Sequence, residues 1–151
     1  MKILLVEDQL DKKENILNFI ESIFSDFEVS DCSSLRGALR EIVSNNNYDL
    51  ILLDMSMPAF DPSESYMDDS PESYAGMELM EQMKLRSIKI PVIVVTQFSS
   101  FEGGSVALDG LSSSFVSKFR DFYYGHVYYN SANENWKSEL EARIKSLNES
   151  K

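Results

Sequence analysis

Three carboxylates follow two apolar runs in this sequence. Glu7 and Asp8 come directly after residues 3–6 (ILLV), and Asp54 comes directly after residues 50–53 (LILL). Continuous apolar runs of this length are typical of strands that are buried on both faces of a sheet. Carboxylates that meet at one point repel each other and stay partly protonated unless a cation joins them. Mg²⁺, which prefers oxygen ligands and retains some of its waters, is the natural partner for such a group.

The elements that would position these acids alternate along the chain. Apolar runs predict buried strands at 3–6, 48–58 and 90–97, and shorter patterns predict strands at 27–34 and 125–130. Apolar residues at helical spacing predict helices over 12–24, 34–46, 76–86, 108–122 and 131–147. Alternation of strand and helix, repeated five times, predicts an α/β fold in which helices cover both faces of a parallel sheet.

Sheet order decides whether the acids meet. In open parallel sheets, ligands bind outside the carboxyl ends of the strands, where the strand order reverses. A flavodoxin-like (βα)5 sandwich has the order 2-1-3-4-5, which makes the first and third strands neighbours and brings Glu7, Asp8 and Asp54 together. Alternatively, the acids could cap helix N-termini or line a solvated rim. One acidic strand end would fit that interpretation, but three acids on adjacent strands favour a functional site.

Four segments carry a family resemblance. LLVEDQ, DLILLDMSMP, GMELM and PVIVVTQ together resemble the receiver domain of two-component response regulators. Receivers have an acidic pair after the first strand, an Asp-x-x-Met-Pro-like turn after the third, and a Thr or Ser after the fourth. Each feature is present here in that order over residues 1–98, beyond which the likeness fades. We therefore expect residues 1–151 to form a single flavodoxin-like receiver domain.

The resemblance implies a role for each residue of the site. Asp54 is the implied phosphoacceptor, a carboxylate nucleophile that forms an acyl phosphate. Glu7, Asp8 and Asp54 are the implied side-chain ligands of Mg²⁺, and the main-chain carbonyl of Ser56 would complete the set. Thr96 would donate its hydroxyl to a phosphoryl oxygen. Its alternative interpretation is a β-branched residue that merely ends a strand.

The end of the fifth strand departs from the family pattern. Receivers usually carry a lysine there, followed by a proline, and the lysine pairs with the phosphoryl group. If residues 125–130 form this strand, Tyr129 or Asn130 stands in the place of the lysine. Lys118 is a rival, because it follows Thr96 at a distance typical of the family. We favour the first alignment, because only then does a strand precede the last helix.

A polar segment at residues 59–75 is the second departure. It contains two prolines and five acids but no lysine or arginine, which predicts a long inserted loop. It could be a lid over Asp54, a partner-binding segment, a second cation site or a mobile solvated insertion. We favour the last, because the acids lack the regular spacing of a metal site. His126, the only histidine, excludes a multi-histidine metal site, and we expect it to make a structural hydrogen bond.

Composition narrows the class of protein. A chain of 151 residues fits one domain, and its net charge of -11 argues against binding to a nucleic-acid backbone. The single cysteine, Cys32, cannot form an internal disulfide, which agrees with a reducing compartment. The first apolar run is too short for a membrane span and lacks the features of a signal peptide. We therefore expect a cytoplasmic protein that does not bind a membrane.

The function implied by the resemblance is that of a stand-alone response regulator. It would accept a phosphoryl group from a histidine kinase or a phosphotransfer protein and act on a downstream effector through protein contacts, with homodimerisation through the helix 4–strand 5–helix 5 face as an option. Because the last predicted helix ends close to Lys151, we expect no DNA-binding or enzymatic output domain. Any catalysis would be limited to the protein's own aspartyl phosphorylation and dephosphorylation.

Two other classes of function remain open. A pseudo-receiver would keep the fold and bind proteins independently of phosphorylation, and the missing lysine and altered loop favour it. An aspartate-nucleophile phosphatase of the haloacid dehalogenase type would also form an aspartyl phosphate. That type has a second Asp two residues after the nucleophile, where this chain has Ser56, so we favour it least.

Overall fold

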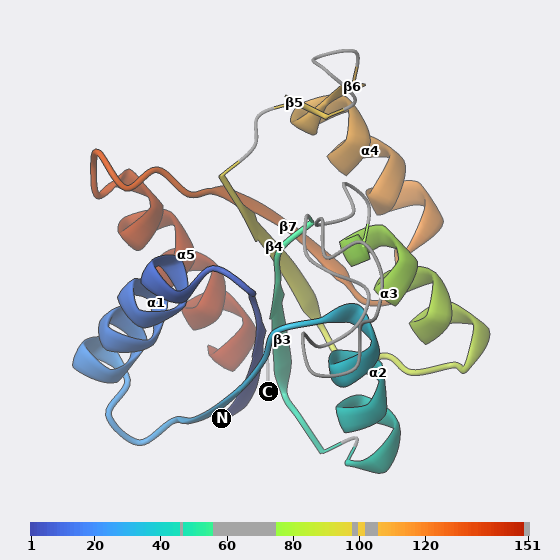
Figure 1. The fold of residues 1–151 in the computed structure, drawn as a ribbon, viewed down its shortest axis with the longest axis horizontal. Helices are drawn as coiled ribbons and strands as arrows, with labels where there is room; N and C mark the ends of the chain where they lie inside the picture. The colour runs from blue at the N-terminus through green and yellow to red at the C-terminus, as the bar shows by residue number, and fades with distance from the viewer. Residues whose placement is uncertain (46, 56–74, 98–99, 102–105, 150–151) are drawn as a thin grey trace, which may run out of the picture.

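The computed structural model describes residues 1–45, 47–55, 75–97, 100–101 and 106–149 (Figure 1). The strands are β1 (Lys2–Val6), β2 (Glu28–Cys32), β3 (Leu50–Leu53), β4 (Val92–Thr96), β5 (Ser100–Phe101), β6 (Val106–Ala107) and β7 (Tyr123–Tyr128). The helices are α1 (Leu10–Ile23), α2 (Leu35–Ser44), α3 (Ala75–Leu85), α4 (Leu108–Lys118) and α5 (Asn135–Glu149). The predicted loop at 59–75 lies outside the described residues, except for Ala75.

Five parallel strands form one sheet in the order β2-β1-β3-β4-β7, which confirms the predicted order 2-1-3-4-5. The last residue of β1, Val6, pairs with Cys32 on one side and Leu53 on the other, and Leu53 pairs with Val94. The carboxyl ends of β1, β3 and β4 therefore lie along one edge of the sheet. Glu7, Asp8 and Asp54, the three acids of the predicted site, follow β1 and β3 at this shared edge.

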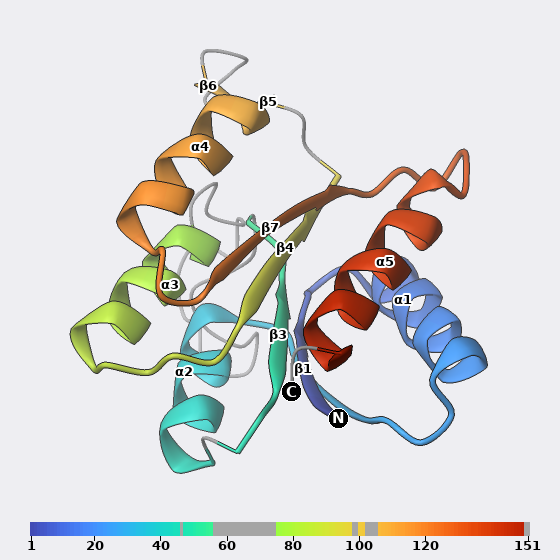
Figure 2. The same cartoon turned by 180° about the vertical axis from the view of Figure 1, so that it is seen from behind.

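Helices cover both faces of the sheet, as Figures 1 and 2 show from opposite sides. Helices α1 and α5 pack on one face, where Ile16 and Leu140 join the core, and α2, α3 and α4 pack on the other. Strand residues alternate between the two faces, so Ile3 and Leu5 belong to the first core and Leu4 to the second. Because every residue of β3 and β4 is buried, these strands read in the sequence as unbroken apolar runs.

Three strands differ from the sequence-based expectation. Strands β5 and β6 form a small antiparallel ladder before α4, with Ser100 paired to Ala107. Two-residue strands are too short to give a periodic signal, so the sequence did not indicate them. Strand β7 begins at Tyr123 rather than at residue 125, directly after a turn in which the amides of Phe122 and Tyr123 both bond the Phe119 carbonyl.

Across the described ranges, no helix is both long and apolar enough to cross a membrane.

Candidate functional site

Backbone hydrogen bonds extend the sheet by one residue beyond β1 and β3 and fix the acids in place. The amide of Glu7 donates to the Cys32 carbonyl at 2.9 Å, and the amide of Asp54 donates to the Val6 carbonyl at 3.1 Å. The backbone of Asp54 is also covered by α3, since Gly76 donates its amide to the Met55 carbonyl at 3.0 Å. The site is therefore built on the rigid end of the sheet rather than on a loop.

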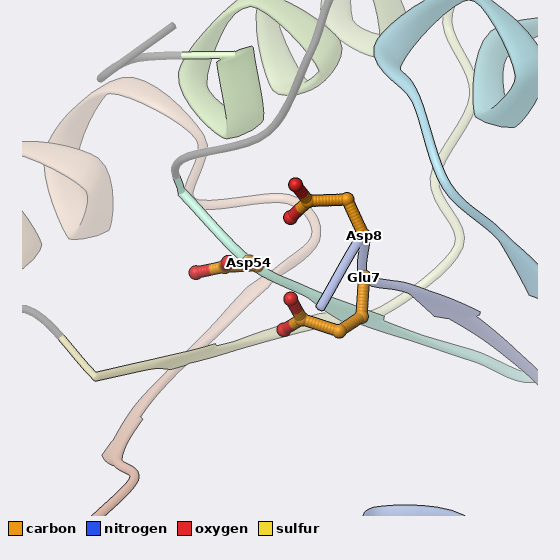
Figure 3. A group of neighbouring side chains, drawn as sticks. All are labelled: Glu7, Asp8 and Asp54. Carbon is orange, nitrogen blue, oxygen red and sulfur yellow. The ribbon is translucent and has the colours of Figure 1, made fainter. Parts of the chain in front are cut away.

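The three predicted carboxylates converge. Figure 3 shows Glu7 and Asp8 at the end of β1, with their carboxyl groups directed to the side on which Asp54 lies at the end of β3. One oxygen of each lies within 4.8 Å of the others. Glu7 and Asp54 are buried, whereas Asp8 is more open to solvent. The proximity expected from strand order is thus confirmed for all three residues.

Burial and mutual repulsion disfavour the charged forms of these acids. Burial raises the pKa of Glu7 to about 7, even though the nearby Lys12 ammonium lowers it, and the Asp54 charge raises it further. Burial, followed by the Asp54 charge, also raises the pKa of Asp8. The three carboxyl groups therefore have less negative charge together near neutral pH than three isolated carboxyl groups would have. A cation bound between them would offset their mutual repulsion and favour their charged forms.

A fourth side chain, Lys12 of α1, belongs to the site and was not identified from the sequence. Its Nζ lies 2.6 Å from Glu7 Oε1 and 3.4 Å from Asp54 Oδ1, and it donates a hydrogen bond to the Val95 carbonyl at 2.8 Å. The side chain is 1% exposed. One signal could have revealed it: Lys12 stands four residues before Ile16, in register with the buried face of α1.

Tyr129 lies beside this lysine. It follows β7 directly and donates its amide to the Thr96 carbonyl at 2.8 Å. Its buried ring has its centroid 5.6 Å from Lys12 Nζ, its hydroxyl accepts a hydrogen bond from Asn15 Nδ2 at 2.8 Å, and it packs on Trp136 with ring centroids 5.0 Å apart. Tyr129 therefore occupies the strand-end position at which the family resemblance led us to expect a lysine.

Lys118 lies elsewhere. It is the last residue of α4 and precedes β7, whose first residue, Tyr123, pairs with Val92 at the start of β4. The acids lie at the other ends of these strands. Lys118 Nζ pairs with Glu81 Oε1 at 2.6 Å on the protein surface. The structure thus removes Lys118 as a candidate for the acidic site.

The remaining predicted residues have different outcomes. Thr96 is fully buried at the end of β4, one residue after the carbonyl that Lys12 contacts. Ser56, the predicted main-chain ligand, lies outside the described residues. His126 Nδ1 and Ser112 Oγ share a hydrogen bond of 2.8 Å, which confirms the expected structural role, and Ser112 Oγ also bonds the Tyr123 hydroxyl.

The donor set fits a hard divalent cation. Carboxylate oxygens are among the ligands that Mg²⁺ prefers. One carboxylate oxygen of this cluster, Asp54 Oδ1, is buried and lacks a hydrogen-bond partner among the described residues, although Lys12 lies within ion-pair distance. Glu7 differs, because its Oε2 accepts a hydrogen bond from the Gln9 amide at 3.0 Å and its Oε1 faces Lys12. Asp8 and Asp54 are therefore the carboxylates best placed to bind a cation directly.

Comparison with known proteins identifies the family. The response regulator receiver domain family matches residues 3–122, and the chain belongs to this family. The chain is 29% identical to the Detocs response regulatory protein DtcB of Enterobacter cloacae, over 97% of this chain and 100% of that protein. Receiver domains generally bind Mg²⁺ at an acidic pocket and interact with histidine kinases and effectors in two-component systems.

Solved structures share the fold. Response regulator protein TrrA from Thermotoga maritima, in complex with Mg²⁺-BeF, aligns with a TM-score of 0.63 and 20% identity, covering 97% of each chain. A CheY-like receiver domain protein from Methanospirillum hungatei aligns with a TM-score of 0.63 and 23% identity, covering 98% of this chain and 94% of that one. These likenesses confirm the flavodoxin-like receiver fold.

Proposed function

We propose that this receiver accepts a phosphoryl group on Asp54 from a phospho-histidine of a kinase or a phosphotransfer protein. The observation that carries the proposal is the convergence of Glu7 and Asp8 on Asp54, whose buried Oδ1 has no hydrogen-bond partner among the described residues. A carboxylate oxygen that the protein does not satisfy is available as a nucleophile. The arrangement matches what an aspartyl-phosphate site requires.

In the proposed reaction, an Asp54 carboxylate oxygen attacks phosphorus and forms the new P–O bond. The P–N bond of the donor breaks, and the imidazole nitrogen leaves with the bonding electron pair. Asp8, Asp54 and the Ser56 carbonyl would hold Mg²⁺, with Glu7 beside them, and the ion would offset the charge of the phosphoryl oxygens. Thr96 would donate its hydroxyl to a phosphoryl oxygen.

The phosphorylated receiver would signal through direct contacts with other proteins. We assign the docking or dimer surface to the face formed by α4, β7 and α5, on which Val116, Tyr124 and Tyr128 expose apolar side chains. Tyrosine is enriched in protein interfaces, which supports this choice. We place the protein in the cytoplasm, where kinases and effectors of two-component systems would meet it.

The test is phosphorylation with acetyl phosphate and Mg²⁺, followed by intact-protein and peptide mass spectrometry. We expect the wild type to gain one phosphoryl group on Asp54 and Asp54→Asn to gain none. Asp49→Asn is the matched control, because Asp49 directly precedes β3, at the opposite end of this strand from Asp54, where its Oδ2 accepts a hydrogen bond from the Lys2 amide. Equal phosphorylation of the wild type and Asp54→Asn would show that Asp54 is not the acceptor.

One observation favours a second candidate, the pseudo-receiver that binds proteins without phosphorylation. Lys12 already places a positive charge beside Glu7 and Asp54, which lowers the need of the cluster for a metal ion. Calorimetric titration with Mg²⁺ separates the two candidates. A receiver binds Mg²⁺ at millimolar concentration and takes up phosphate, whereas a wild-type protein that does neither would be a pseudo-receiver.

A further inference from the structure

We propose that Lys12 is the lysine of the phosphoryl site, supplied by the first turn of α1 instead of by the end of the last strand. The inference rests on the proposed function, since it assigns a role in phosphoryl transfer to Asp54. It explains how a receiver that lacks a lysine after β7 can still place a cation beside its acceptor.

The contacts of Lys12 Nζ carry the proposal. An ammonium group has three N–H donors and no acceptor. Two of them are directed to Glu7 Oε1, at 2.6 Å, and to the Val95 carbonyl, at 2.8 Å. The group lies 3.4 Å from Asp54 Oδ1, which has no hydrogen-bond partner among the described residues. One donor therefore remains for an oxygen on or next to Asp54.

Stability alone does not account for a buried lysine at this position. Removing an ammonium group from water is costly, and a buried ion pair often stabilises a protein no better than well-packed apolar residues of similar volume. Lys12 stands in register with Ile16 and Ile20, which are fully buried on the same face of α1. An apolar residue would continue that face, so a lysine at 1% exposure fits a requirement for charge at the site.

The position of Tyr129 supports the proposal that Lys12 replaces the lysine expected after β7. It occupies the residue after β7, and its ring centroid lies 5.6 Å from Lys12 Nζ. The residue after β7 and Lys12 of α1 are therefore neighbours, although they come from different elements. The aromatic face of Tyr129 also interacts favourably with the ammonium group that it faces.

During transfer, Lys12 would donate a hydrogen bond to an oxygen of the incoming phosphoryl group as Asp54 forms its bond to phosphorus. Lys12 keeps all three of its protons, because the leaving group of the donor departs on the opposite side of phosphorus. Glu7 and the Val95 carbonyl hold the ammonium group in position before the donor arrives, so little reorganisation is needed. The lysine thus stabilises charge in the transition state and takes no part in proton transfer.

Lys12→Met tests the proposal, with Lys13→Met as the matched control. Lys13 is adjacent on α1 and loses the same charge, but its Nζ pairs with Asp31 at 2.9 Å and not with the acids of the site. With acetyl phosphate as the donor, we expect Lys12→Met to be phosphorylated on Asp54 roughly 100-fold more slowly than the wild type, the lower end of the effect of losing one charge-stabilising donor. Lys13→Met should stay within about twofold of the wild type.

Mg²⁺ affinity distinguishes a chemical role from simple damage to the site. Removing a positive charge beside the acids should leave Mg²⁺ binding unchanged or make it tighter, while phosphorylation slows. A misfolded site would lose both. The double variant Lys12→Met/Tyr129→Lys returns an ammonium group from the strand end, and we expect it to recover at least part of the lost rate.

Two results would overturn the proposal. One is Lys12→Met phosphorylation within twofold of the wild type; the other is parallel loss of Mg²⁺ binding and phosphorylation in Lys12→Met, with no recovery in the double variant. Failure of the proposed function looks different, because the wild type itself would then not be phosphorylated.

Discussion

Gly76, the second residue of α3, lies against the backbone of the proposed phosphoacceptor. A Cβ atom at this position would be 2.7 Å from the Asp54 carbonyl oxygen and 2.9 Å from the Met55 Cα. Carbon atoms normally approach to about 3.5 Å, and backbone atoms cannot change rotamer to make room. In Gly76→Ala, the start of α3 must therefore move away from β3 by several tenths of an ångström.

Overpacking of this kind costs about 1–3 kcal/mol. Alanine is better than glycine by about 1 kcal/mol within a helix, but residue 76 lies in the first turn, where less of this preference is recovered. We expect the free energy of unfolding of Gly76→Ala to fall by about 1–2 kcal/mol relative to the wild type. Because the shift displaces the Asp54 backbone, phosphorylation by acetyl phosphate should slow as well.

Urea unfolding followed by far-UV circular dichroism measures the effect. With a slope of about 2 kcal/mol per molar urea, the midpoint should fall by roughly 0.5–1 M. Gly110→Ala is the control, because Gly110 is an exposed residue in the first turn of α4 and no atom of the described residues lies within 4 Å of the added Cβ. Its free energy of unfolding should stay within about 0.5 kcal/mol of the wild type. Gly76→Ala with a midpoint equal to or above that of the wild type would refute the reasoning.

Two further substitutions test the backbone that supports the fold. Ser34→Ala removes the 3.0 Å hydrogen bond that the Ser34 hydroxyl accepts from the Gly37 amide at the N-cap of α2. The free energy of unfolding, measured with urea, should fall by about 1 kcal/mol. An unchanged value would show that this N-cap does not stabilise the protein. Gly125→Ala places a side chain at φ +102° in β7, against the Arg143 guanidinium, and should lower the thermal midpoint by several degrees. A midpoint unaffected by Gly125→Ala would contradict the assigned backbone conformation.

The sequence was sufficient to predict the sheet and the convergence of the acids. Strands β1, β3 and β4 are buried on both faces, so their apolar runs are unambiguous, and each acid follows such a run directly. Once strand order is given, Glu7, Asp8 and Asp54 must share one edge. The apolar pattern and the strand order both predict that these acids lie together, so this part of the site could be predicted from the sequence.

Lys12 and Tyr129 show where sequence reasoning ended. A lysine in an amphipathic helix is usually assigned to the solvated face, and only contacts with Val95 and Asp54, far along the chain, make this one part of the site. An aromatic residue after a strand is usually assigned to the core, which is also true of Tyr129. Lys12 and Tyr129 become neighbours only because the start of α1 lies beside the end of β7 in the folded protein. Local sequence patterns do not predict this contact.

The contact between Tyr129 and Trp136 gives the protein an intrinsic optical reporter. Trp136 is the only tryptophan in the chain, and its ring packs on Tyr129, whose ring also faces the Lys12 ammonium. A change in the position or charge pairing of Lys12 is thus one aromatic ring away from the fluorophore. We therefore expect Trp136 emission to change when the acidic end of the sheet binds a cation or a phosphoryl group, which would let the unlabelled protein be followed in real time.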